Sequence, residues 1–263
     1  MKRILTLTTD FGTRDAYVAA MKGLMLQINP DVQLIDVTHE IAPHDIMEAA
    51  FVLLGALPYF PAGTTHLVVV DPGVGTDRPP IALRKGGHLF VGPDNGLFSL
   101  VLEGEQPDEL VRLDQPDFWR TPHPSRTFHG RDLFAPAAAH LSAGRPLQTL
   151  GSPHPALKRL QWALPIQDEQ GIQGWVVHID HFGNCITNIA RSHLDTGRRE
   201  PRLKCFVGGT ILDQIHNTYA DVAQGDPVLL LNSEGRLEIA VHAGNASSLL
   251  SIRKGDPINL LFF

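Results

Sequence analysis

The chain has 263 residues, of which 43% are apolar and 19% are charged, and its formal net charge is −6 at pH 7. This composition is that of an ordinary globular protein, and the length leaves room for about two domains. An acidic balance argues against a nucleic-acid partner, and no apolar run reaches the ~18 residues that a membrane span needs. The two cysteines, Cys185 and Cys205, form no disulfide framework, so we expect reduced thiols in a cytoplasmic protein.

Strands and helices are predicted to alternate through residues 1–150. Apolar and β-branched runs predict strands at residues 4–9, 32–37 and 65–70. Helical spacing of apolar side chains, with Asp45 as one N-cap, predicts helices at residues 15–28, 45–57, 97–102 and 133–143. A short antiparallel pair is expected at residues 81–83 and 88–91. This alternation predicts a layered α/β domain with a mostly parallel sheet.

The pattern changes after residue 150. Residues 151–170 are predicted to form a linker, because four prolines fall between Pro146 and Pro165. Residues 171–263 contain no convincing helix. Short strands are expected there at residues 174–179, 203–207, 228–232, 237–241 and 257–262, with glycine-containing turns between them. This spacing predicts a small, all-β domain, a barrel or a sandwich.

The segment 64–78 is the most informative stretch of the chain. Its apolar strand ends at Asp71, in a turn that Pro72, Gly73 and Gly75 keep tight and free of side chains. Ligands of open α/β sheets sit beyond the carboxyl ends of such strands, so Asp71 is expected at the mouth of a crevice. Arg78 follows seven residues later and could fold back to pair with it. A carboxylate that only caps its own turn is an equally good interpretation at this stage.

Two other groups of residues could carry chemistry. His129 precedes a helix whose positive end suits anionic ligand groups. In the second half, Asn184 offers an amide that can pair with a purine edge, and Phe182 offers a stacking face. The structural alternatives are that Asn184 is a left-handed turn residue and that Phe182 belongs to the core.

Several enzyme classes are disfavoured. His39 and His44 lie close together, but they lack the register of a helical zinc pair and no cysteine ligands accompany them, so we expect no metal site. Neither a Gly-x-Ser-x-Gly elbow nor a Walker-type loop is present. Serine-hydrolase and P-loop chemistries are therefore poor candidates.

Six short motifs in fixed order carry a resemblance that covers nearly the whole chain. They are residues 9–12 (TDFG), 70–75 (VDPGVG), 92–96 (GPDNG), 127–132 (TFHGRD), 180–184 (DHFGN) and 232–235 (NSEG). Together they resemble the S-adenosyl-L-methionine (SAM) hydroxide adenosyltransferases, hydrolase relatives of the fluorinase and chlorinase enzymes. The halogenases have a tyrosine where Asp71 stands and a serine where Gly130 stands, so the resemblance favours the hydrolase branch.

This resemblance implies a Rossmann-like N-terminal domain and a β-barrel C-terminal domain, assembled as a homotrimer. The implied reaction is hydrolysis of SAM at C5′ to adenosine and L-methionine, with SAM as substrate and no cofactor. Asp71, Arg78 and His129 would form the water-activating triad. The resemblance implies substrate contacts from Asp10, Phe11, Asp15, Asp94, Asn95, Asp180, Phe182, Asn184, Tyr219, Ser233, Glu234, Val241 and Ala243.

Within that set, Asp10 would hold the ribose hydroxyls, Asn184 would bind adenine and Phe182 would stack on it. Ser233, Asp15 and Asp180 would face the methionine end. One position departs from the fluorinase pattern: Glu234 stands where the fluorinase has an arginine that binds the methionine carboxylate. Another group must then make that contact.

Two other functions stay open at the level of sequence. A halogenase would use chloride at C5′, but the carboxylate of Asp71 would repel the anion. A non-catalytic SAM or adenosine sensor would bind the same molecules without turnover. Product analysis separates all three.

Overall fold

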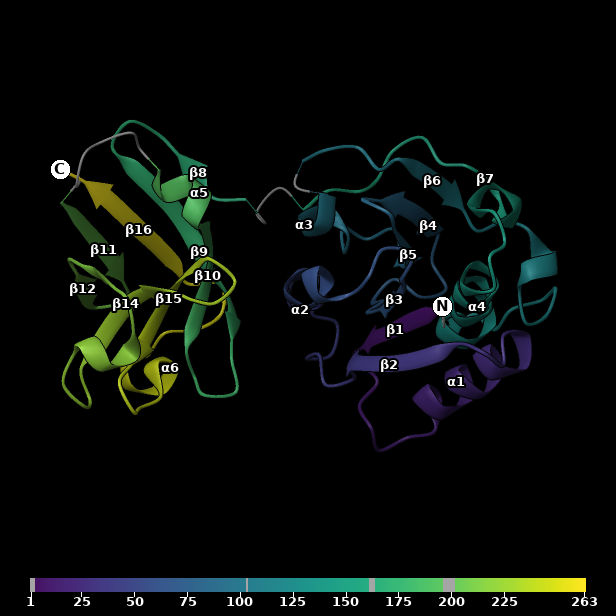
Figure 1. Cartoon of the computed structure of the whole chain (residues 1–263), viewed down its shortest axis with the longest axis horizontal. Helices are drawn as coiled ribbons and strands as arrows, with labels where there is room; N and C mark the ends of the chain where they lie inside the picture. The colour runs from purple at the N-terminus through teal and green to yellow at the C-terminus, as the bar shows by residue number, and fades with distance from the viewer. Residues whose placement is uncertain (1–2, 103, 161–163, 196–201) are drawn as a thin grey trace. The chain divides into compact units, whose positions relative to one another are not determined.

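The computed structural model describes residues 3–102, 104–160, 164–195 and 202–263, and it divides into two compact units, Met1–Leu160 and Gln161–Phe263 (Figure 1). The division falls within the predicted linker 151–170, of which residues 161–163 lie outside the described part. In the described part, no helix is both long enough and apolar enough to cross a membrane.

The first unit is built on a seven-stranded mixed sheet. Its strands, in spatial order, are β2 (Gln33–Thr38), β1 (Ile4–Thr9), β3 (Thr65–Val69), β5 (His88–Pro93), β4 (Pro80–Lys85), β6 (Glu109–Arg112) and β7 (Ser152–Pro153). The first four are parallel to one another, and β4, β6 and β7 are joined antiparallel. The parallel part is therefore confined to one half of the sheet.

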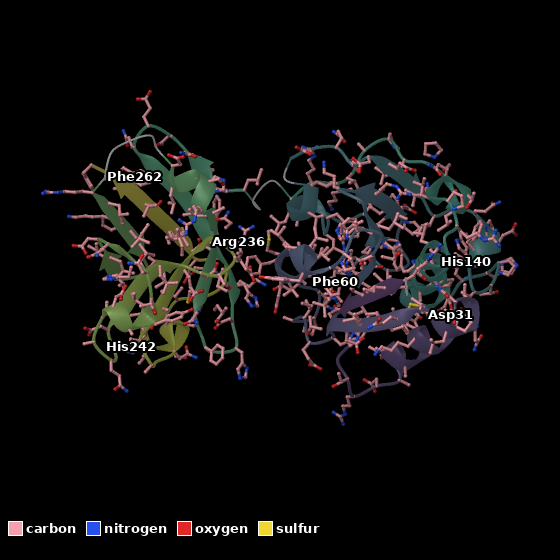
Figure 2. All side chains as sticks on the ribbon, in the orientation of Figure 1. Asp31, Phe60, His140, Arg236, His242 and Phe262 are labelled. Carbon is pink, nitrogen blue, oxygen red and sulfur yellow. The ribbon has the colours of Figure 1, made fainter. Side chains whose placement is uncertain are left out.

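The helices of the first unit are α1 (Tyr17–Ile28), α2 (Ile46–Ala56), α3 (Ser99–Leu102) and α4 (Ala135–Ser142), with short turns η1 (Leu57–Tyr59), η2 (Pro116–Phe118), η3 (Gly130–Phe134) and η4 (Leu147–Leu150). Figure 1 shows α1 and α4 on one side of the sheet and α2 and α3 on the other. Burial on both faces explains why β3 is a largely apolar run and why even the three threonines of β1 are buried. The side chains that fill this core are drawn in Figure 2.

Most predicted elements of this unit are present, and the differences have local causes. Asp45 caps α2, with its side chain accepting a hydrogen bond from the Glu48 amide at 2.9 Å. The helix predicted at 133–143 is preceded by a wide turn, η3, so the helical segment begins at Gly130. Strands β6 and β7 were not predicted, because they are short and β7 carries Pro153 at the sheet edge.

The second unit contains a nine-stranded, largely antiparallel sheet. Its strands run in the order β12 (Thr210–Leu212), β11 (Leu203–Val207), β16 (Pro257–Phe262), β9 (Gly171–Ile179), β10 (Cys185–Ala190), β15 (Arg236–Val241), β14 (Pro227–Leu231) and β13 (Ile215–His216), and β8 (Ile166–Gln167) also pairs with β9. Within the described residues of this unit, the strands are accompanied by the single-turn helices α5 (Arg191–Leu194), η6 (Tyr219–Asp221) and α6 (Ala246–Leu249).

All five strands predicted for this half are present, while its short helices were not predicted. Both cysteines are free and buried, Cys185 on β10 and Cys205 on β11. Both belong to the hydrophobic core of this unit. The closed barrel stays a prediction.

Candidate active site

The first unit has a pocket of about 520 Å³ at the carboxyl ends of its parallel strands. Strands β1 and β3 are neighbours, so the residues that follow them, Asp10 and Asp71, reach the same edge of the sheet (Figure 1). The pocket is lined by Asp10, Phe11, Tyr17, Pro43, His44, Val69, Asp71, Val74, Ser125, Thr127, Phe128, His129, Gly130 and Arg131. The sequence motifs at residues 9–12, 70–75 and 127–132 therefore meet in one place.

Asp71, Arg78 and His129 form a connected group at this pocket. Arg78 Nε donates to both carboxylate oxygens of Asp71, at 2.9 and 3.1 Å, and its Nη2 also pairs with Oδ2. The same Nη2 lies 2.7 Å from His129 Nδ1. The side chains of Asp71 and Arg78 are 6% and 9% exposed, so the ion pair is shielded from water. The guanidinium is also held over the Phe134 ring, 5.1 Å from its centroid.

The contact with Arg78 fixes the protonation state of His129. A guanidinium can only donate hydrogen bonds, so Nδ1 of His129 must accept and carries no proton. The neutral ring then bears its proton on Nε2. Burial, and next the positive charge of Arg78, lower the pKa of His129 below its ordinary value. His129 is therefore a neutral hydrogen-bond donor through Nε2.

Asp71 keeps the capacity to accept a further hydrogen bond. A carboxylate offers about four acceptor positions, and Arg78 occupies only part of them. In the turn that follows, the Val74 amide donates to the backbone carbonyl of Asp71 at 3.2 Å, whereas the side chain of Asp71 pairs with Arg78. The alternative in which this carboxylate merely caps its own turn is thus wrong, and the predicted pairing with Arg78 is confirmed.

A second carboxylate, Asp132, holds together two segments that line the pocket. It is fully buried and accepts from Arg120 Nε at 2.5 Å, Arg131 Nε at 2.7 Å and the Ser125 amide at 2.8 Å. Burial alone would raise the pKa of Asp132, but these hydrogen bonds outweigh it and hold the pKa at about 2. The loop that carries Ser125 and Thr127 is thereby tied to the turn next to His129.

An aromatic cluster forms another wall of the pocket. The ring centroids of Phe11 and Phe128 are 5.8 Å apart, and Tyr17 lies 5.2 Å from Phe128. Gly130 allows this packing, because a Cβ there would stand 3.2 Å from both Phe11 and Phe128 and 3.3 Å from the Met21 sulfur. A serine at this position, as the resemblance assigns to the halogenases, would crowd these rings.

Asp10 is held from the next loop. Its Oδ2 accepts from the backbone amide of His44 at 2.9 Å, and His44 adopts a left-handed conformation with φ of 69°. Gly12, with φ of 65°, turns the chain after Asp10 and donates to the His39 carbonyl at 2.7 Å. The free Oδ1 of Asp10 and its partly exposed position leave it available to a ligand.

In the second unit, Asp180, Phe182 and Asn184 share the turn between β9 and β10. Asp180 Oδ1 accepts from the amides of Phe182 and Asn184, both at 2.9 Å, and Oδ2 accepts from the side-chain amide of Asn184 at 2.9 Å. Phe182 is 74% exposed, so it is not a core residue. Gly183 rather than Asn184 has the positive φ, so the interpretation of Asn184 as a left-handed residue is wrong as well.

Other predicted residues of the second unit lie on or near β15. Tyr219 donates to Glu238 Oε1 at 2.8 Å, and burial raises the pKa of Glu238, which is 2% exposed. Ser233 and Glu234 are exposed in the turn before β15, where the Glu234 amide donates to Asn232 Oδ1. Val241 ends β15, and Ala243, two residues later, has φ of 55°.

Three residues of the first unit that were predicted to bind substrate do not line the pocket. Asp15 is exposed just before α1. Asp94 is buried and accepts from the Lys158 amide at 2.8 Å, with His154 Nε2 at 3.2 Å. Asn95 donates to the Val70 carbonyl at 2.9 Å and so braces the strand end that presents Asp71. The structure gives Asp94 and Asn95 internal partners.

Several residues of the pocket were missed from the sequence. Tyr17 lies in the predicted helix 15–28, and Thr127 and Phe128 lie in the motif 127–132, but the sequence assigned none of them a role. Ser125 lies outside every motif. His44 acts through its backbone amide, which no side-chain pattern reports. Among the described residues, no three or more His, Cys, Asp or Glu side chains are grouped so as to hold a metal ion.

Comparisons with known proteins agree with these motifs. A family model for the SAM hydroxide adenosyltransferase N-terminal domain matches residues 5–151, and one for the C-terminal domain matches residues 174–259. A Thermus thermophilus protein named (R)-S-adenosyl-L-methionine hydrolase is 39% identical over 270 residues, covering 96% of this chain and 97% of its own length. A fluorinase from an Actinoplanes species is 30% identical, covering 98% of this chain and 97% of its own length.

The fold is also found in a solved structure. The crystal structure of an uncharacterized conserved protein from Thermotoga maritima matches with a TM-score of 0.89 at 37% identity, covering 98% of this chain and 99% of that one. Motifs, family models and fold agree over both units. The chain belongs to the SAM hydroxide adenosyltransferase family.

Proposed function

We propose that the protein hydrolyses (R)-S-adenosyl-L-methionine at C5′ to give adenosine and L-methionine. The observation that carries this proposal is the connected group Asp71–Arg78–His129 at the edge of a pocket. Relatives that cover nearly the whole chain at 37–39% identity, and that are named for this hydrolysis, support it.

The reaction needs a well-placed water more than an acid. The sulfonium is a good leaving group, so the C5′–S bond breaks with its electron pair going to the methionine sulfur. Asp71 accepts one proton of the attacking water, and the Nε2–H of His129 donates to its oxygen, which leaves a lone pair for C5′. The proton passes from Asp71 to solvent. Holding the water in line with the breaking bond is the main catalytic contribution.

Arg78 keeps this arrangement in place. Its hydrogen bonds orient the carboxylate of Asp71, and its positive charge helps to keep His129 a neutral ring, so acceptor and donor cannot exchange roles. The net reaction consumes SAM and water and releases one proton, so we propose that it requires no cofactor. Asp10, at the same pocket, is proposed to bind the ribose hydroxyls with its free carboxylate oxygen.

The second unit is proposed to bind the rest of the substrate. Phe182 presents an exposed ring suited to stacking on adenine. The Asn184 amide, oriented by Asp180, is proposed to pair with the adenine edge. We propose that Asp180 and Ser233 face the cationic methionine end, while Tyr219 and the backbone near Val241 and Ala243 complete the adenine side. The carboxylate of Glu234 would repel the methionine carboxylate, so we propose that another group binds that carboxylate.

The active species is proposed to be a homotrimer in which two chains supply the two sets of groups. Complementation tests this. Asp71→Asn and Asn184→Ala protomers are unfolded together and refolded, and the mixture is assayed. Activity above both parents is expected, because some sites then combine intact halves. A mixture that shows only the average of the two variants would contradict shared sites.

Product analysis tests the function itself. Purified protein and SAM are incubated with and without chloride, and products are separated by liquid chromatography. Adenosine and methionine without any halide are expected. A 5′-chloronucleoside formed only with chloride would indicate the halogenase, although Asp71 disfavours an anion at that position. Unchanged SAM that stays bound would indicate a sensor.

A further inference from the structure

A line of polar side chains lies directly behind Asp10. Thr9, the last residue of β1, is fully buried, and its hydroxyl lies 2.8 Å from His39 Nδ1. The other ring nitrogen of His39 is 3.0 Å from Asp36 Oδ1, at an angle outside that of an aligned hydrogen bond. Asp36 in turn accepts from Lys22 Nζ at 2.5 Å. His39 is 5% exposed, so its imidazole is almost completely buried in the first unit.

The donors and acceptors of this line can be assigned. The Phe11 amide donates to Thr9 Oγ1 at 3.3 Å, which leaves the Thr9 hydroxyl proton free to be donated to His39 Nδ1. His39 then carries its proton on Nε2, next to the carboxylate of Asp36. One tautomer therefore serves both contacts of the ring, and the line ends at the ion pair of Asp36 with Lys22.

His39 also joins the two loops on either side of Asp10. Its carbonyl accepts from the Gly12 amide at 2.7 Å, and the Ile41 amide donates to the Thr9 carbonyl at 3.4 Å. Further along the same loop, the backbone amide of His44 donates to Asp10 Oδ2. The ring and the backbone of His39 thus fix the turn after Asp10 and the loop that donates to Asp10.

The same sheet contains a matched histidine away from the pocket. His66, on β3, is 1% exposed, and its Nδ1 lies 2.8 Å from the hydroxyl of Thr6 on β1. Its second nitrogen faces His88 at 3.2 Å, and its ring stacks on Phe90. The two histidines share burial and a threonine partner on β1, but only the His39 pair adjoins Asp10. His66 is therefore an internal control.

We propose that His39 is a positioning residue that fixes Asp10 in the orientation that binds the two ribose hydroxyls. The proposal rests on the proposed function, because it takes Asp10 as the ribose-binding carboxylate. His39 touches no substrate in this account. It acts through Thr9, Gly12 and the loop leading to His44, so its loss should weaken recognition of the hydroxyls specifically.

The test compares two nucleosides that differ only in those hydroxyls. Binding of adenosine and of 2′,3′-dideoxyadenosine is measured by calorimetry for the parent protein and for His39→Leu, with thermal unfolding to verify the fold. The parent should prefer adenosine. His39→Leu should bind adenosine roughly 5–10-fold more weakly, the effect of about one misplaced hydrogen bond, and should bind dideoxyadenosine as the parent does.

Additional variants separate positioning from general damage. Thr9→Val, which removes the hydroxyl at the base of the line, should show the same selective loss, and it keeps the test available if His39→Leu does not fold. His39→Asn, whose side-chain oxygen can accept from Thr9, should recover part of the preference for adenosine. His66→Leu removes an equally buried histidine and should leave the ratio of the two affinities unchanged.

The outcomes distinguish this inference from the proposed function. Equal weakening of both nucleosides in His39→Leu, or a loss of preference in His66→Leu as large as in His39→Leu, would overturn the positioning role. A parent that hydrolyses SAM but binds both nucleosides alike would overturn it too, while the hydrolase function stands. A parent that neither binds adenosine nor consumes SAM would overturn the proposed function itself.

Discussion

The first unit contains two shielded aspartates that pair with arginines and that do different things. Asp132 is fully buried and its oxygens are occupied by Arg120, Arg131 and a backbone amide. Asp71 lies at a pocket, and its arginine partner is shared with His129. A carboxylate with all its acceptor positions filled holds structure together. A carboxylate that lies at a pocket and still has acceptor positions left can receive a proton from a bound molecule.

Because of this difference, substitutions of the two aspartates should affect different properties, turnover for Asp71 and stability for Asp132. Changing Asp71 should remove most of the turnover even in protein that remains folded, whereas changing Asp132 should lower stability and leave the turnover of the folded protein largely intact.

The largest effect is expected for Asp71→Asn. The variant keeps the shape of the side chain but removes the charge that accepts the water proton, and loss of a general base costs about 10²–10⁴ in rate. We expect kcat to fall by that factor while SAM affinity stays near that of the parent. The unfolding temperature should fall as well, because the shielded charge of Arg78 loses its counter-charge. Stopped assays with radiolabelled SAM measure the residual rate. Turnover within a few-fold of the parent would mean that Asp71 has only a structural role.

Asp132→Ala should instead lower the free energy of unfolding while the folded protein keeps most of its kcat. Breaking a shielded pair typically costs 3–5 kcal/mol, and we expect about 3 kcal/mol here, since Arg120 and Arg131 are partly exposed and can turn to water. Urea unfolding measures the loss. A stable Asp132→Ala protein with strongly reduced kcat would reverse the assignment of the two aspartates.

The pH dependence of stability should also follow Asp132. Its pKa in the folded protein is about 2, below the unfolded value of 3.8, so the folded state favours the carboxylate. The stability that it contributes is complete above pH 3.8 and is lost as pH falls toward 2, by roughly 2 kcal/mol in total. Asp132→Asn should flatten the unfolding free energy between pH 5 and pH 2. An unchanged slope would show that other carboxylates dominate acid unfolding.

The smallest expected effect concerns the acid limb of the rate profile. Because burial and Arg78 lower the pKa of His129, the ring stays neutral and active below the ordinary value of 6.5. Activity should therefore decline only at lower pH, where protonated His129 can no longer accept from Arg78. Plots of kcat against pH measure this. A decline centred above pH 6.5 would contradict the neutral-donor role.

Sequence alone predicted much of this arrangement, and the failures have physical reasons. Asp10 and Asp71 could be placed at one edge because each ends an apolar strand and parallel strands share an edge. Residues such as His44 and Asp132 could not be placed, because their roles depend on a backbone amide and on a buried network formed only by folding. Asp94 lay in a recognisable motif, yet its partners, His154 and Lys158, come from a segment that prolines marked as a linker.

The central claim is that water attacks C5′ of SAM. Single-turnover reaction in oxygen-18 water, followed by mass spectrometry of both products, tests it most directly. The label should appear in the 5′-hydroxyl of adenosine, with methionine unlabelled, because the oxygen of water forms the new bond to C5′. Label in methionine, or S-adenosylhomocysteine among the products, would contradict the account.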